Sequence, residues 1–314
     1  MFMGQVRSLK PEVRSRRDSR GLAVSEQAAM ARPSSGGRRP RPARHSPVVL
    51  LCVALLLLGA NVRAALQPRA IQTRSGQFTV RGLPADLPVA GTPALTNLSF
   101  IRLDPAVLAV SCERIKQAVL DVLGMPDQWQ GRIFISLHPV RADREPILVR
   151  CAGFRDGWVY SIDLPEQVDR ARLLKLVVEV LLLEIANRRA RDTAAELPPW
   201  LAEGLAAHLQ ATALPILTLE LETLTTREDR RPDPLRGARE VLRRQPALSF
   251  DELNWPAEDM ASEERLAVYR SCAHLFVLGL LRLKNGRACL QDMLARLPEG
   301  LNWQTAFLRS FHQH

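Results

Sequence analysis

The segment that most constrains the fold runs from Pro165 to Arg191. Its centre, residues 173–185, is apolar on almost every side of the helix that its length and spacing predict. A helix without a polar face has to be buried on all sides, so it belongs inside a core and not on a surface. Pro165 is typical of a first helical turn, and a cluster of arginines ending at Arg191 marks the exit. The sequence therefore predicts one long buried helix.

Short alternating or β-branched segments precede this helix and predict a small sheet. Asp156-Gly157 is a good hairpin signal between the last two of these segments. Asp104 and Pro105 begin a helical pattern that Gly124 ends. The expected strands cover residues 77–82, 132–137, 147–151 and 158–164.

Helical patterns dominate the rest of the chain. Pro198-Pro199 restarts a helix at Trp200, and Asn285-Gly286 and Pro298-Glu299-Gly300 separate later ones. The fold class is therefore α+β, with a small mixed sheet in residues 76–164 and a mainly helical part in residues 165–311. The expected helices after the buried one cover residues 200–211, 263–284, 287–297 and 303–311, and residues 225–234 form a charged loop.

The N-terminal segment has the layout of a secretory signal. A basic region precedes an uncharged run at residues 48–60, and Val62-Arg63-Ala64 places small residues where a signal peptidase cleaves. At about 1.5 Å per residue the run spans roughly 20 Å, short of a bilayer core near 30 Å. We expect residues 1–64 to be a leader, residues 65–75 a flexible segment, and the protein to be periplasmic or secreted. An uncleaved membrane tether by residues 48–60 is the alternative, and Met30 is an alternative start to Met1.

The net charge of +10 does not indicate nucleic-acid binding, because the excess is confined to the leader. Residues 1–47 contain eleven Lys or Arg and three acidic residues, whereas from Ala65 onward 31 bases face 30 acids. The folded part is therefore nearly neutral, and we expect no nucleic-acid partner.

Four cysteines lie beyond the leader, and four allow three pairings. An oxidising compartment favours disulfides. We expect Cys112–Cys151 and Cys272–Cys289, one bridge in each half of the domain; four buried free thiols are the alternative.

Two short motifs carry the functional information. In an HExxH motif two histidines at i and i+4 bind zinc and the glutamate acts as general base. Here Glu184 stands at the glutamate position, while Leu183 and Asn187 occupy the two histidine positions. Leucine cannot bind a metal and an amide is a poor zinc ligand. Nineteen residues beyond Glu184, Glu203 lies in Trp-Leu-Ala-Glu-Gly-Leu.

The run Leu-Pro-Pro-Trp-Leu-Ala-Glu-Gly-Leu-Ala-Ala at residues 197–207 resembles the second motif of the gluzincin-type, peptidase MA-like zinc metallopeptidases. In that family HExxH is followed by W-[LI]-x-E-G-[LF]-A, whose glutamate is the third zinc ligand. The resemblance covers residues 76–311 and implies a zincin-like fold. It also implies that Glu184 is a vestigial general base and that Leu183, Asn187 and Glu203 stand at vestigial ligand positions.

We therefore expect an exported, catalytically inactive peptidase-like protein that binds an unknown protein or peptide partner or has a structural role, without a cofactor. The alternative is a zinc-dependent metallopeptidase with a non-standard site using Glu184 and Glu203, completed by one of His138, His208 or His274.

The two motifs also predict local contacts. Glu184 and Glu203 should lie near each other with an arginine between or beside them. Glu184 should pair with Arg188 or another cation, or form a hydrogen bond with the backbone near Trp200. Asn187 should hold the turn before the second helix, and Gly204 should allow two helices to approach closely.

Overall fold

The computed structural model describes residues 69–82, 100–141, 145–217, 233–256, 262–300 and 302–313. They belong to one compact unit of the chain. The expected leader and most of the loop expected at residues 225–234 lie outside these ranges. Among the described residues no single helix has the length and apolar character needed to cross a membrane.

A five-stranded mixed sheet has the order β1-β2-β4-β6-β5. Its strands β2, β4 and β6 are parallel neighbours, whereas β1 and β5 run antiparallel at the two edges. The mixed sheet and the α+β class are as the sequence predicts. The strands are β1 (Arg69–Gln72), β2 (Phe78–Gly82), β4 (Arg132–His138), β5 (Val149–Phe154) and β6 (Gly157–Pro165).

The expected hairpin joins β5 to β6. Phe154 pairs with Gly157 across the two-residue turn Arg155-Asp156, and Gly157 has a φ of 118°. This positive φ is open to glycine and strained for other residues. The Asp-Gly signal therefore fixed both the turn and the register of the edge strand.

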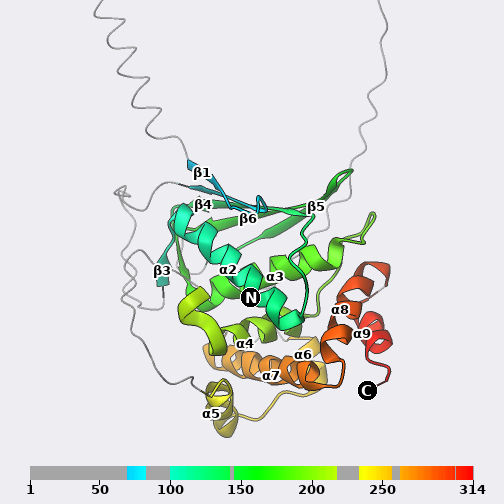
Figure 1. Cartoon of the computed structure of the whole chain (residues 1–314). Coiled ribbons are helices and arrows are strands. Elements are labelled where there is room, and N and C mark those ends of the chain that lie inside the picture. Colours follow the sequence, from blue (N-terminus) through cyan, green and yellow to red (C-terminus); the bar gives the residue numbers. More distant parts are fainter. Residues whose placement is uncertain are drawn as a thin grey trace, which may run out of the picture. The chain divides into compact units, whose positions relative to one another are not determined.

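The long helix α3 (Arg170–Asn187) is the central buried element, as predicted. Thirteen of its eighteen residues are buried, including the whole stretch from Val180 to Asn187. Its N-cap is Asp169, whose side chain accepts a hydrogen bond from the backbone N–H of Arg172 at 3.1 Å. Figure 1 shows α3 and the helix α2 (Pro105–Leu123) together below the sheet.

The prediction that the long helix begins at Pro165 is wrong. Pro165 pairs with His138 as the last residue of β6. A second, two-stranded sheet of β3 (Phe100–Arg102) and β7 (Gln167–Asp169) then precedes the helix. The prediction of a flexible segment at residues 65–75 is also wrong for residues 69–72, which form β1 because β2 offers them a free edge.

The helical part builds a further layer beneath α3. Helix α4 (Pro199–Leu217) packs on α3, and α7 (Glu263–Arg282) packs on α4 (Figure 1). Gly204 of α4 permits this second contact, because a Cβ there would lie 2.3 Å from the backbone oxygen of Ala273 in α7. The remaining elements are α5 (Arg236–Arg244) and α6 (Phe250–Asn254), which the sequence reading missed, and α8 (Gly286–Arg296), the 3₁₀ turn η2 (Leu297–Glu299) and α9 (Trp303–Ser310).

Candidate functional site

Glu184 is the best-satisfied buried carboxylate of the described residues around α3. Its side chain is 2% exposed. One oxygen accepts hydrogen bonds from the backbone N–H groups of Gln130 and Gly131, both at 3.0 Å. The other accepts from Nε and a terminal nitrogen of Arg188, at 3.1 and 3.0 Å. The predicted pairing with Arg188 is confirmed, and the carboxylate is held from two sides.

Arg188 is itself fixed by an aromatic face. Its guanidinium carbon lies 4.9 Å from the centroid of the Trp129 ring, a cation–π distance. Trp129 and Gln130 belong to the segment that leads into β4, so the same segment supports both the carboxylate and its cation. Glu184 therefore connects the C-terminal end of α3 to the segment that leads into β4.

Asn187 uses its amide as a structural connector. Its Oδ1 accepts a hydrogen bond of 2.6 Å from the backbone N–H of Ala195, in the turn before α4. Its Nδ2 donates to the hydroxyl of Tyr160 at 3.1 Å, and that hydroxyl donates to the carbonyl of Leu183 at 3.2 Å. Burial raises the pKa of Tyr160, so the hydroxyl keeps the proton that it donates. The predicted role of Asn187 in holding the turn is confirmed.

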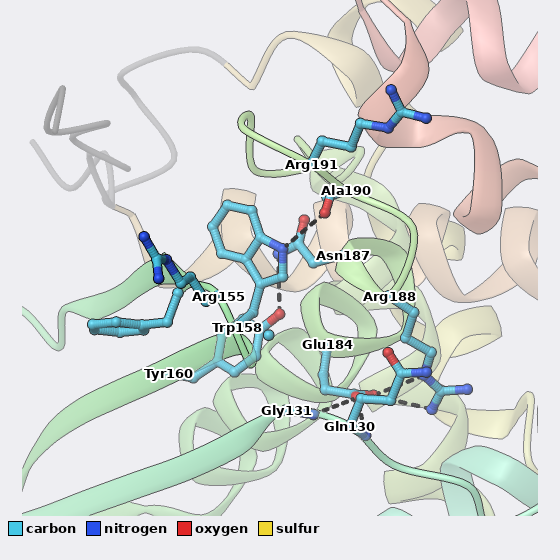
Figure 2. A pocket seen from close by; sticks show the side chains of 12 residues that line it. Gln130, Gly131, Arg155, Trp158, Tyr160, Glu184, Asn187, Arg188, Ala190 and Arg191 are labelled. Carbon is cyan, nitrogen blue, oxygen red and sulfur yellow. Dashed lines mark hydrogen bonds and ion pairs between the residues drawn. The ribbon is translucent and has the colours of Figure 1, made fainter.

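A pocket of roughly 260 Å³ opens beside this network. The tip of the β5–β6 hairpin and the end of α3 line it together (Figure 2). Trp158 stands between them, and its indole N–H donates to the carbonyl of Ala190 at 3.3 Å. Arg155 and Arg191 lie at the rim, with guanidinium groups directed away from Glu184 in Figure 2.

Glu203 has different surroundings. Its carboxylate pairs with Arg270 of α7 at 3.4 Å. Burial alone would lower the pKa of Lys175 in α3, but the charges of Glu179 and Glu203 raise it above its ordinary value. Glu203 therefore lies in a cluster of two acids and two bases at the junction of α3, α4 and α7.

The expected closeness of Glu184 and Glu203 stays a prediction, and among the described residues their carboxylates have different partners. Glu203 faces the side of α3 that carries Lys175 and Glu179, which form a 2.7 Å ion pair one turn apart. Glu184 lies five residues after Glu179 and so points about 140° further round the helix. Leu183, in contrast, lies on the same side as Glu179. Each carboxylate has an arginine of its own, Arg188 for Glu184 and Arg270 for Glu203, in place of the one arginine expected between or beside the two.

The three histidines considered as substitute ligands are also dispersed. His138 lies 3.2 Å from Glu145 beyond the end of β4, whereas His208 and His274 face each other between α4 and α7. In the part of the chain that the structure describes, no three His, Cys, Asp or Glu side chains gather as a possible metal site. Nothing in the described geometry therefore completes a site on Glu184 or Glu203.

The four described cysteines are free thiols, so neither expected disulfide is present in the structure. The pairing of Cys272 with Cys289 rested on their lying in adjacent helices. Cys272, however, lies ten residues before the end of α7, about 15 Å along the helix axis from the turn to α8. Cys112 is fully buried on α2, and burial raises the pKa of its thiol.

Sequence reasoning missed the partners that make this site. The sequence pattern places Trp158 and Tyr160 in a strand and assigns no role to Gly131. A Cβ at Gly131 would lie 2.9 Å from Cγ of Glu184 and 2.8 Å from the Tyr160 ring. The isolated glycine before a strand was the available signal, since such a glycine often marks a close approach.

The comparisons with known proteins supply no function for this site. Neither a scan against protein-family models nor a search of curated proteins finds a match to the chain. A function has to be inferred from the geometry of the α3 terminus, the β5–β6 hairpin and the pocket between them.

Proposed function

We propose that this chain is an exported, catalytically inactive relative of zinc peptidases that binds an extended segment of a protein partner. The observation that carries the proposal is the hydrogen bonding of the Glu184 carboxylate. A general base needs a free lone pair directed at a water or substrate. Both oxygens of Glu184 instead accept hydrogen bonds from Gln130, Gly131 and Arg188, inside a buried network.

The zincin-like fold is part of the same proposal. Support comes from the buried helix α3 under a small mixed sheet, followed by α4 with Glu203 in its first turns. Leu183 and Asn187 project from α3 one turn apart, and Leu183 shares its side of the helix with Glu179. This is the frame that two histidine ligands and a downstream glutamate would need.

Restoring the ligands tests this frame. The double substitution Leu183→His and Asn187→His is expected to create zinc binding, with Glu203 as third ligand. Adding Glu203→Gln to the double variant should weaken that binding about tenfold or more, since a ligand is at least as important as its supporting residues. Isothermal titration with zinc measures both. Zinc affinity that is indifferent to Glu203 would contradict the zincin-like frame.

The free edge of β5 is the surface proposed to bind the partner. Phe154 and Gly157 close the hairpin, so hydrogen-bonded pairs alternate from there and the N–H groups of Val149, Cys151 and Gly153 point away from β6. Among the described strands nothing pairs with that side of β5. An extended peptide can add a strand to such an edge through main-chain hydrogen bonds.

The pocket supplies the selectivity. It lies at the hairpin end of β5, so a side chain of the added strand can enter it. Trp158 and Phe154 offer aromatic surface, and Phe154 is 64% exposed. Arg155 and Arg191 at the rim have no acidic partner among the described residues, which favours an extended segment that carries an acidic side chain.

Two substitutions at Gly153 test whether a peptide binds through main-chain hydrogen bonds at the β5 edge or in another way. Gly153→Pro removes the outward N–H, whereas Gly153→Ala keeps it, and a Cβ there meets only ordinary contacts with the Trp158 ring at 3.5 Å. Peptides selected from a phage-displayed random library on the wild-type protein are expected to bind Gly153→Pro about tenfold more weakly, the value of one hydrogen bond. They should bind Gly153→Ala unchanged, as measured by fluorescence anisotropy.

Two results would overturn the proposal. Equal binding by both Gly153 variants, or no selectable peptide, would remove the β5 edge as a binding surface. Stoichiometric zinc in the purified wild-type protein, with cleavage of casein, would replace the proposal with the metallopeptidase alternative.

A further inference from the structure

Two histidines, the buried His274 and the partly buried His208, meet at the contact between α4 and α7, away from the proposed binding surface. The ring centroids of His208 and His274 are 5.5 Å apart. His274 is only 4% exposed. Nδ1 of His208 and Nε2 of His274 are buried and have no hydrogen-bond partner among the described residues. Neither ring is therefore equipped to carry a positive charge.

The charges around the pair do not favour protonation either. Burial and, to a smaller extent, the neighbouring His208 together lower the pKa of His274 to about 4. Burial also lowers the pKa of His208, with a contribution from Arg282 at the end of α7. Four acids on the elements packed around this contact have partners elsewhere: Glu203 of α4 with Arg270, Glu179 of α3 with Lys175, Glu240 of α5 with Arg236, and Glu252 of α6 with Ser249 and Arg265.

The two helices approach closely at this contact. A Cβ at Gly204, one turn before His208, would lie 2.3 Å from the carbonyl oxygen of Ala273, which precedes His274. Trp200, at the start of α4, packs edge-on against Phe276 of α7 with ring centroids 4.8 Å apart. A proton on the buried Nδ1 of His208 or Nε2 of His274 therefore gains a hydrogen-bond acceptor only if α4 and α7 move apart.

We propose that the His208–His274 pair makes the α4–α7 contact acid-labile, so that proton uptake from solvent separates the two helices while the sheet and α2 stay folded. The sign follows from linkage. An exposed histidine has a pKa of about 6.5, so below that pH the opened state binds more protons than the closed state. The contact keeps its full stability above about pH 6.5 and loses it as the pH falls towards 4.

Hydrogen exchange read by mass spectrometry tests the proposal on the intact chain. After correction for the intrinsic exchange rate, the opening constant of peptides from α4 and α7 should rise about thirtyfold between pH 7.5 and pH 5, from His274 alone. Peptides from α2 should keep their protection. The variant His274→Gln, neutral at both pH values, should remove the part of the rise that His274 causes and leave only the part from His208; His208→Gln should also reduce the rise and serves as the second variant if the first does not fold.

The outcomes are distinct. An equal rise in the wild-type protein and in a folded glutamine variant would show that other groups cause the acid response, and would overturn the proposal. Loss of protection in α2 together with α4 and α7 would show global acid unfolding and would overturn it as well. The result does not depend on whether β5 binds a peptide.

Discussion

Replacing Glu184 with alanine is expected to lower the free energy of unfolding by about 3 to 5 kcal/mol, the cost of breaking a buried ion pair from one side. The substitution removes the carboxylate that pairs with Arg188, whose side chain is only 17% exposed. It also leaves the N–H groups of Gln130 and Gly131 without their acceptor. Urea denaturation followed by circular dichroism measures the change.

The matched control is Glu240→Ala. Glu240 and Arg236 form an ion pair with the same four-residue spacing, but their side chains are 51% and 78% exposed. Exposed pairs contribute little, so the control should change stability by less than about 0.5 kcal/mol. If Glu184→Ala lowers the free energy of unfolding as little as Glu240→Ala does, Glu184 does not hold the end of α3 to the start of β4. Its hydrogen bonds would then leave it free for another role.

Replacing Gly204 with alanine is expected to destabilise the protein by about 1 to 2 kcal/mol net. The new methyl group would meet the backbone oxygen of Ala273 at 2.3 Å and a methyl of Val277 at 2.6 Å. A backbone atom cannot swing aside, so α4 and α7 would have to separate, and overpacking of this kind costs about 1 to 3 kcal/mol or more. That loss outweighs the gain of about 1 kcal/mol from the helix propensity of alanine.

Gly279→Ala provides the control in the partner helix. Gly279 also lies within α7, but a Cβ there meets nothing within 4 Å. The same substitution should therefore stabilise the protein by up to about 1 kcal/mol through helix propensity alone. Thermal denaturation of both variants should give melting temperatures that move in opposite directions. A shift of the same sign in both would show that the α4–α7 contact is not closely packed at Gly204.

Local sequence signals determined the elements of this protein and several of their ends. Asp104 caps α2 through its side chain, Gly124 ends it with a φ of 70°, and Asp156-Gly157 turns the hairpin. The largely apolar pattern of residues 173–185, with only Lys175, Glu179 and Glu184 charged, predicted the buried helix. These features depend on residues a few positions apart, so the sequence alone is sufficient to predict them.

Sequence patterns were weaker where a strand or short helix depends on a distant partner. Residues 69–72 and 167–169 form strands because β2 and β3 offer them hydrogen-bonding edges. Their own sequences are too short to show a period. The start of α3 was misplaced for the same reason, since Pro165 is held by its pairing with His138.

The sequence also determined what the site lacks, because leucine and asparagine at positions 183 and 187 cannot replace two histidine ligands. Only the tertiary structure decided what the retained residues do instead. Glu184 accepts hydrogen bonds from the N–H groups of Gln130 and Gly131, more than fifty residues earlier in the chain. Glu203 pairs with Arg270 on another helix. Burying a carboxylate requires compensating donors, and the donors for Glu184 and Glu203 come together only when the sheet, α3, α4 and α7 pack.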